Sequence, residues 1–319
     1  MNLDVLDEDN IKHRRLLAAV ATSVFISSKT KKFIVVGRTK KRCNAGYQSV
    51  VLKITNLKME KPALFTRMFR LSPQAFDKVM DIIKPKLISK KVSAENSVPP
   101  MVKLCLGLRL LAGASYLDLS FGYNVTASCV HHYAWQALDA IDSSMYAYLD
   151  NIKSPIHATA KELSQLELGF AELSDFKLRG TVAAGDGIVF RMQMPTNEEV
   201  DGDVTSYFTR KGYYAYGLQA FCDAQSRFVM ISSQLCSSTN DNTCYIVTQL
   251  SKDIKAGRLP PQYHVVLDEA YPCMGQEMSL RKGRNLSVEK DAFNYYLSFN
   301  RQVIEQAFGI LVQRSGIFW

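Results

Sequence analysis

Three acidic residues lie where a carboxylate is unfavourable unless it has a partner. Asp186 sits between two glycines in the apolar, strand-like run "TVAAGDGIVFRMQMP" (181–195), and Asp268 ends the apolar run "VVLD". Glu305 lies at the edge of the apolar face of a helix that the spacing predicts over about 294–312. Because an unpaired buried acid is costly, three acids that converged at strand ends would repel one another unless a cation held them.

Magnesium (or manganese) suits such a cluster, because Mg²⁺ prefers oxygen ligands and keeps positions open for water and phosphate oxygens. Two ions about 4 Å apart can activate a water and stabilise the leaving oxygen when a phosphodiester is cut. Asp186 would then be a metal ligand, and its flanking glycines would let a phosphate backbone approach closely. Ordinary interpretations stay open: a turn at Asp186, a cap of the next segment at Asp268, and an ion pair between Glu305 and Arg301.

The elements that must position these acids change in type along the chain. Apolar residues recur at helical spacing from Pro62 to about 173, and strand patterns begin near Thr181. The later order is a strand, a hairpin over 213–235, a helix over 243–257, a short buried strand and the last helix, which indicates a mixed sheet with flanking helices. The fold class expected is therefore α/β, preceded by an all-α domain.

The helical part contains a candidate helix-turn-helix. Helices are expected at about 99–112, 115–121 and 126–141, with Ser115 and Thr126 as caps. Two short helices joined by a turn, the second longer, are typical of that DNA-binding motif. A plain helical bundle is the alternative, because the third helix is not strongly basic.

The charge of the chain is concentrated at its beginning. The net charge is +9, and residues 1–70 hold 15 Lys/Arg against 5 Asp/Glu, whereas 71–319 hold 24 against 25. The run "KTKKFIVVGRTKKR" (29–42) fits nuclear import, phosphate contact or a solvated arm. Seven cysteines without a CxxC pair support neither a zinc site nor a disulfide framework. No apolar run is long enough to span a membrane.

Four stretches together resemble one family. They are "GDGIVFRMQMP", "YFTRKGYYAYGLQAFCDAQSRF", "VVLDEAYPCMGQEM" and "DAFNYYLSFNRQVIEQAFGILVQR", the last with the pattern FN-x-x-LS-x-x-R-x-x-x-E-x-x-FG. Over about 65–319 the chain resembles the Harbinger-type (PIF/Harbinger, IS5-related) DDE transposases and the nucleases derived from them.

The resemblance implies a ribonuclease H-like catalytic core with the triad Asp186, Asp268 and Glu305. In that family the triad binds divalent metal, Mg²⁺ or Mn²⁺, and cuts DNA at transposon ends, after which the freed 3′ hydroxyl attacks target DNA. Nuclear localisation, a Myb-like DNA-binding partner encoded with the element and a homo-oligomer are the further expectations. The candidates for DNA contact are Arg210, Lys211, Arg281, Lys282, Arg284 and Arg301.

The expected domains are a basic, loosely structured arm over 1–60, a helical domain over 61–175 and a catalytic domain over 176–319, apparently truncated at its C-terminus. Asn240 precedes Asp241 where the family often has His-Asp, so Asp241 is a fourth acid or a helix cap, and the cap is favoured. Ser315 stands where the family commonly has Trp. These departures keep an alternative open: a domesticated or decayed descendant that binds DNA or protein without cutting.

Overall fold

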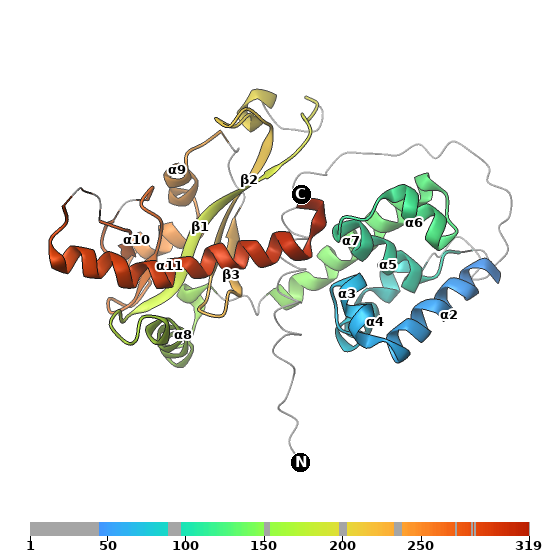
Figure 1. Cartoon of the computed structure of the whole chain (residues 1–319), viewed down its shortest axis with the longest axis horizontal. Coiled ribbons are helices and arrows are strands. Elements are labelled where there is room, and N and C mark those ends of the chain that lie inside the picture. Colours follow the sequence, from blue (N-terminus) through green and yellow to red (C-terminus); the bar gives the residue numbers. More distant parts are fainter. Residues whose placement is uncertain are drawn as a thin grey trace, which may run out of the picture. The chain divides into compact units, whose positions relative to one another are not determined.

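The computed structural model describes residues 45–318, except for 89–96, 150–153, 198–202, 233–237, 272, 282 and 284. It divides into two compact units, Met1–Tyr148 with Val312–Trp319, and Leu149–Leu311 (Figure 1). The basic run 29–42 lies outside the described residues. Among these residues no helix is long and apolar enough to cross a membrane.

The first unit is helical. Its elements are α2 (Ala45–Glu60), α3 (Pro62–Phe69), α4 (Pro73–Leu87), α5 (Pro100–Leu111), α6 (Tyr116–Tyr123), α7 (Ala127–Leu149) and the 3₁₀ turn η4 (Gly316–Phe318). Helix α2 differs from the loose arm expected there, because Tyr47, Val50 and Ile54 recur at helical spacing and are buried. Phe65 and Phe76 pack edge to face, with ring centroids 5.2 Å apart.

Caps set the boundaries of the candidate helix-turn-helix. Gly113, at φ 88°, lies just beyond the end of α5, and the side chain of Ser115 caps α6. Asn124 ends α6 in the left-handed conformation, and the Thr126 hydroxyl accepts a hydrogen bond from the Cys129 N–H at 3.4 Å. The expected helices are therefore present with closely similar ends, except that α7 continues to Leu149.

The second unit contains the sheet. Its elements are η2 (Pro155–His157), α8 (Ala160–Leu173), β1 (Thr181–Arg191), η3 (Val204–Tyr207), β2 (Ala215–Cys222), β3 (Phe228–Ser232), α9 (Asp241–Ile246), α10 (Gln249–Lys255), β4 (His264–Val266), β5 (Glu277–Met278) and α11 (Val288–Arg314). By its contacts α8 belongs with β1, although the sequence analysis drew a boundary at 175. The single helix expected over 243–257 is two helices, because Thr248 caps a new one by accepting from the Ser251 N–H at 3.2 Å.

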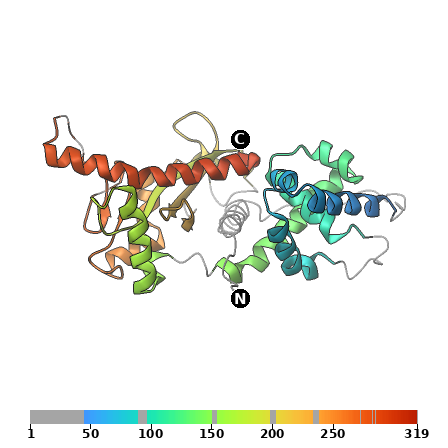
Figure 2. The same ribbon diagram turned by 60° about the horizontal axis from the view of Figure 1, so that its bottom comes forward.

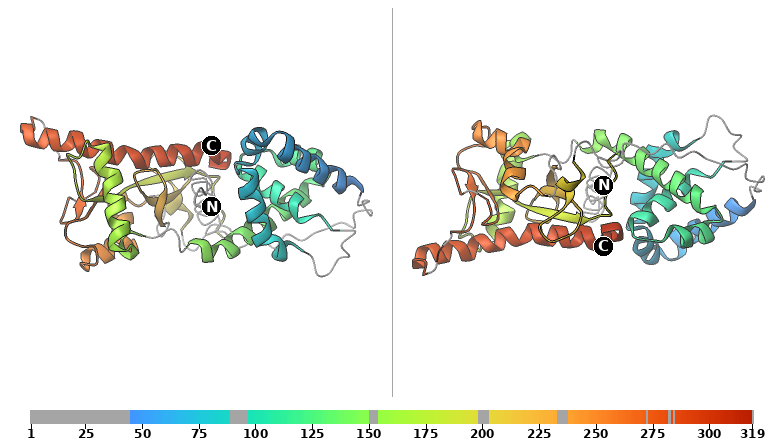
Figure 3. Two further views of the ribbon diagram at one scale, coloured as in Figure 1. Left: turned by 90° about the horizontal axis from the view of Figure 1, so that it is seen from below. Right: turned by 90° about the horizontal axis from the view of Figure 1, so that it is seen from above.

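The sheet has five strands in the order β3-β2-β1-β4-β5. β1 pairs antiparallel with β2 and parallel with β4, so the sheet is mixed, as expected, and compatible with a ribonuclease H-like fold. Figure 3 shows α11 along one face of the sheet and α9 and α10 on the other, and Figure 2 shows α8 running across the direction of α11. Phe308 of α11 packs on Phe228 of β3, with ring centroids 6.0 Å apart.

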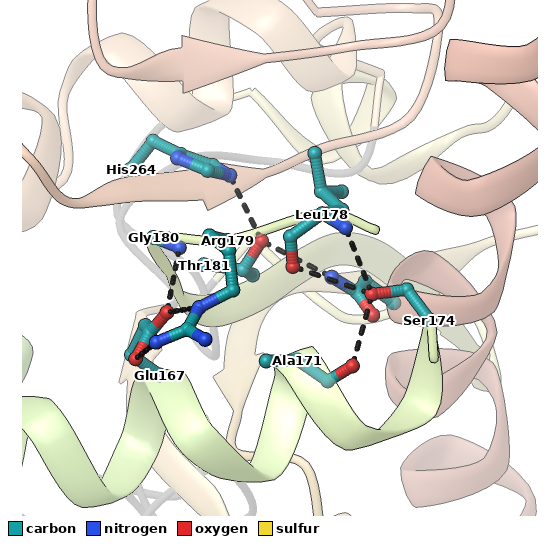
Figure 4. A network of polar contacts seen from close by, with 9 residues as sticks. Glu167, Ala171, Ser174, Leu178, Arg179, Gly180, Thr181 and His264 are labelled. Atoms are coloured by element: carbon teal, nitrogen blue, oxygen red, sulfur yellow. Dashed lines mark hydrogen bonds and ion pairs between the residues drawn. The ribbon is translucent and has the colours of Figure 1, made fainter. Parts of the chain in front are cut away.

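A buried polar junction joins three of these elements. The Thr181 hydroxyl of β1 lies 2.8 Å from Nε2 of His264 on β4, and Asn300 of α11 donates to the same hydroxyl at 3.1 Å. Because Asn300 donates to it, the hydroxyl can donate its own proton to a neutral imidazole. Figure 4 shows Thr181 and His264 beside the ion pair between Glu167 of α8 and Arg179.

Burial lowers the pKa of His264 to about 4, against the opposing charge of Glu167. The unfolded chain therefore binds more protons than the folded chain between about pH 6.5 and pH 4, and folding stability falls as the pH falls through that window.

We expect the free energy of unfolding of the sheet to fall more steeply from pH 7 to pH 5 in the wild type than in His264→Gln. The difference should be about 2 kcal/mol, because the variant has no imidazole to protonate. Urea unfolding followed by hydrogen exchange of β1 and β4 peptides measures it. Equal pH dependence in the two proteins would show that His264 is solvated.

Candidate active site

Asp186 lies on β1, and Asp268 lies two residues beyond the end of β4, the parallel neighbour of β1. The register pairs Ala184 of β1 with Val266 of β4, and each aspartate follows its paired residue by two positions. Residues two apart on a strand share a face, and neighbouring strands lie about 4.8 Å apart. The topology therefore brings together two acids that are 82 positions apart in the sequence.

The surroundings of Asp186 favour its neutral form. The pKa of Asp186 is raised to about 6, chiefly by burial and also by the negative charges of Asp268 and Asp241. The Gly187 N–H, which donates to Oδ1 at 2.7 Å, and the charge of Arg301 act in the opposite direction. The acid that the sequence singled out thus lies within the electrostatic reach of two other carboxylates and one guanidinium.

Asp241 is not the helix cap that the sequence analysis favoured. Asn240 is the cap of α9, and its side chain accepts from the Thr243 N–H at 2.8 Å. Asp241 is the first residue of the helix, and its Oδ1 lies 2.7 Å from the point that a Cβ on Gly187 would occupy. Asp241 therefore packs against β1 at Gly187, and its charge raises the pKa of Asp186; that it joins the acids of the site stays a prediction.

The two glycines around Asp186 serve the packing of the protein itself. A Cβ on Gly185 would lie 2.2 Å from the ring of Phe221, its partner on β2. A Cβ on Gly187 would lie 2.7 Å from both Asp241 Oδ1 and Gln219 Nε2. The absence of a Cβ at these positions makes room for Phe221, Asp241 and Gln219, and the close approach of a phosphate backbone stays a prediction.

Arg301 and Glu305 approach the aspartates from α11. Arg301 Nη1 lies 2.5 Å from Glu305 Oε1, one helical turn away, and 4.0 Å from Asp268 Oδ1. The Arg301 side chain is 18% exposed and that of Glu305 is 51% exposed. Glu305 is therefore joined to the acidic site through Arg301, as the ion-pair interpretation of the sequence allowed.

Two buried residues that the sequence analysis missed lie beside these acids. The Tyr271 hydroxyl donates to Gln219 Oε1 at 2.9 Å, and Gln219 lies opposite Gly187 on β2. Burial, followed by the charges of Asp186 and Asp241, raises the pKa of Tyr271, which stays a proton donor. No sequence pattern could have found this pair, because the strand register must be known first.

The donor chemistry fits a hard divalent cation. Asp186, Asp241, Asp268 and Glu305 offer only carboxylate oxygens, which are the ligands that Mg²⁺ and Mn²⁺ accept. Within the described part of the chain, however, no three acidic, histidine or cysteine side chains are close enough together to hold an ion. Asp268 and Glu305 instead both lie within 4.0 Å of Arg301, which supplies positive charge among the acids.

The other described basic candidates, Arg210, Lys211 and Arg281, lie in other segments of the chain. Arg210 and Lys211 are exposed in the turn between Thr209 and Gly212, beyond the last pair of β1 and β2, Arg191 with Ala215. That pair is already five residues from Asp186, or about 17 Å along a strand. These two side chains therefore do not lie beside the carboxylates.

Arg281 is held at the beginning of α11. Its backbone N–H donates to Asn294 Oδ1 at 2.8 Å, and Asn294 Nδ2 donates to its carbonyl at 3.0 Å. The guanidinium lies over the Phe293 ring, 5.7 Å from its centroid. Lys282 and Arg284 lie outside the described residues.

We expect Asp186 in the metal-free protein to titrate near pH 6. Asp268→Asn should lower that pKa, because it removes a neighbouring negative charge, whereas Asp291→Asn on the exposed start of α11 should leave it unchanged. Carboxyl ¹³C NMR of aspartate-labelled protein measures both effects. A value near 3.8 in the wild type would mean that the carboxyl is solvated and isolated.

Comparison with known proteins gives one match. Residues 185–317 match the model of the DDE superfamily endonuclease family, a segment that is less than half of the chain. Searches of curated proteins and of solved structures returned no match.

The matched segment contains Asp186, Asp241, Asp268, Arg301 and Glu305. Nucleases of this superfamily act on DNA and generally use divalent metals. The geometry and the match together support a DDE transposase-like nuclease domain over residues 185–317.

Proposed function

We propose that this protein is a metal-dependent DNA endonuclease and strand transferase of the Harbinger type. The observation that carries the proposal is the placement of Asp186 on β1 and of Asp268 just beyond the parallel strand β4, each two residues after the pair Ala184–Val266, inside the segment that matches a DDE endonuclease. The ion would be Mg²⁺ or Mn²⁺, because the donors are all carboxylate oxygens.

Each acid has a role in this proposal. Asp186 and Asp268 hold the cation, Glu305 completes the set from α11, and Asp241 adds negative charge beside Asp186. The bound metal supplies activation of a water and stabilisation of the leaving oxygen. A bound cation would favour the carboxylate form of Asp186, and Tyr271 holds Gln219 by a hydrogen bond on the strand beside the one that carries Asp186.

Basic residues around the acids would contact the DNA, in addition to Arg301, which lies among the acids. Arg210, Lys211 and Arg281 are exposed and suited to phosphate contact. Helix α7 contains no Lys or Arg over Ala127–Leu149, so the candidate helix-turn-helix would need its phosphate contacts from other segments.

The wider biology follows from the resemblance. The substrate would be the ends of a transposon, with the freed 3′ hydroxyl attacking target DNA in the nucleus. A Myb-like protein encoded with the element would assist DNA binding, and a homo-oligomer would bring two ends together.

A second candidate is a descendant that binds DNA or protein without cutting. The observation that favours it is the pairing of Glu305 with Arg301, together with the finding that no three of the described acids are close enough to hold an ion. Cleavage separates the two candidates, since only the first requires a product.

We expect the wild type to nick DNA that carries the element's ends when Mg²⁺ or Mn²⁺ is present, and not in EDTA. Asp186→Asn and Asp268→Asn should each lower the cleavage rate by more than about 100-fold. Substitution of residues that only support a metal ligand costs up to about 100-fold, and these two residues would be ligands themselves. Glu172→Gln, an exposed acid at the end of α8, is the control and should cut normally.

A denaturing gel of end-labelled DNA measures the product. Wild-type protein that binds the DNA yet gives no product with either metal would favour the non-cutting descendant. Cleavage that survives Asp186→Asn would remove that residue from the site.

We expect Arg210→Ala with Lys211→Ala to weaken DNA binding and to lower the slope of log affinity against log salt by about 2. For each phosphate contact that is lost, DNA binding releases about 0.9 fewer counterions, and the slope becomes less steep by the same amount. Lys161→Ala with Lys255→Ala, which removes the same charge from α8 and α10, is the control. Fluorescence anisotropy over a salt series gives the slopes, and equal slopes in the two double variants would exclude the turn as a DNA contact.

A further inference from the structure

Arg301 lies between carboxylates from two different elements. Its Nη1 is 2.5 Å from Glu305 Oε1 on the same helix and 4.0 Å from Asp268 Oδ1, just beyond β4. Its charge also reaches Asp186 on β1, whose carboxylate form it favours. One guanidinium therefore contacts or influences all three acids that the proposed function assigns to the metal.

This arrangement is more than a surface ion pair. Exposed pairs one helical turn apart are weak, but the Arg301 side chain is only 18% exposed and reaches an acid on a different element. Its Nε is buried and has no hydrogen-bond partner among the described residues. A buried donor without a partner is unfavourable, so the position of the guanidinium is maintained by the charges around it.

The backbone beside Arg301 is fixed. The neighbouring residue, Asn300, is fully buried and donates to Thr181 on β1 at 3.1 Å. Any exchange at the site must therefore be made by the Arg301 side chain, which rotates while α11 keeps its place.

We propose that Arg301 is the resident counter-cation of the acidic site, and that a divalent ion must displace its guanidinium from Glu305 before Asp186, Asp268 and Glu305 can share that ion. The inference rests on the proposed function, because it takes these three acids as the metal ligands. It accounts for a cluster of acids in which no three are yet close enough to hold an ion. The released guanidinium, with its planar set of donors, is then suited to a phosphate oxygen of the DNA.

The test is Mn²⁺ binding to the metal-free full-length protein, measured by electron paramagnetic resonance. If the state closed by Arg301 is populated about ten to one, its removal should tighten Mn²⁺ binding about tenfold in Arg301→Gln. Lys255→Gln, which removes the same charge from an exposed position on α10, should change the affinity less than twofold. Arg301→Lys, a smaller cation without the planar fork, should lie between the wild type and Arg301→Gln.

Adding Glu305→Gln to Arg301→Gln should remove the gain, because the ligand that Arg301 blocks is then absent. Mn²⁺ binding by Arg301→Gln that is no tighter than that of Lys255→Gln would overturn the inference, and so would a gain that survives Glu305→Gln. Circular dichroism checks that every variant is folded.

Cleavage, measured in parallel, separates this inference from the proposed function. Arg301→Gln should bind Mn²⁺ more tightly and cut more slowly, since the phosphate contact is lost. Tighter Mn²⁺ binding with no cleavage by any protein would support the role of Arg301 and contradict the nuclease. Normal cleavage by the wild type, with equal Mn²⁺ affinities of the wild type and Arg301→Gln, would support the nuclease and contradict the role of Arg301.

Discussion

The site depends on one buried hydrogen-bonded junction, in which Asn300 donates to Thr181 and the Thr181 hydroxyl faces His264. These residues lie on α11, β1 and β4. Glu305 and Asp186 follow on the same helix and strand, and Asp268 lies two residues beyond the end of β4. Because the junction sets the position of α11 on two adjacent strands, it sets which turn of the helix faces the aspartates. The interaction is polar and buried, so it is favourable only when every partner is in place, which makes the helix position specific.

Around that fixed frame the electrostatics of the site are balanced by the protein's own charges. Burial and two neighbouring carboxylates work against the charged form of Asp186, and one guanidinium works for it. The same guanidinium neutralises Glu305. The carboxylates of this site lie around an internal cation, Arg301, and in the proposed function a metal ion would have to change that arrangement.

Sequence patterns predicted the kinds of element well and their contacts less well. Alternating and helical spacing was sufficient for the helices between residues 62 and 141, for the mixed sheet and for the strand around Asp186, whereas α2 was expected to be part of a loose arm. For Asp186 and Asp268 the sequence predicted only that acids at strand ends would converge. It could not predict which residues lie next to each other, because the register of β1 on β4 is a long-range property. The role of Asp241 was missed for a local reason: Asn240 and Asp241 are both good caps, and only the position of the Asn240 side chain on the Thr243 N–H decides between them. Tyr271 and Gln219 had no signal in the sequence at all.

The glycines on either side of Asp186 have a consequence for inheritance. Every other amino acid carries a Cβ, and at both positions that atom would meet a neighbour at 2.7 Å or less. At position 185 the added atom would meet the ring of Phe221, whereas at position 187 it would meet the ends of the Asp241 and Gln219 side chains, which can move. We therefore expect substitution at Gly185 to distort the strand more than substitution at Gly187. In a gene copy released from selection, a change at Gly185 would be a sign that this strand is no longer maintained.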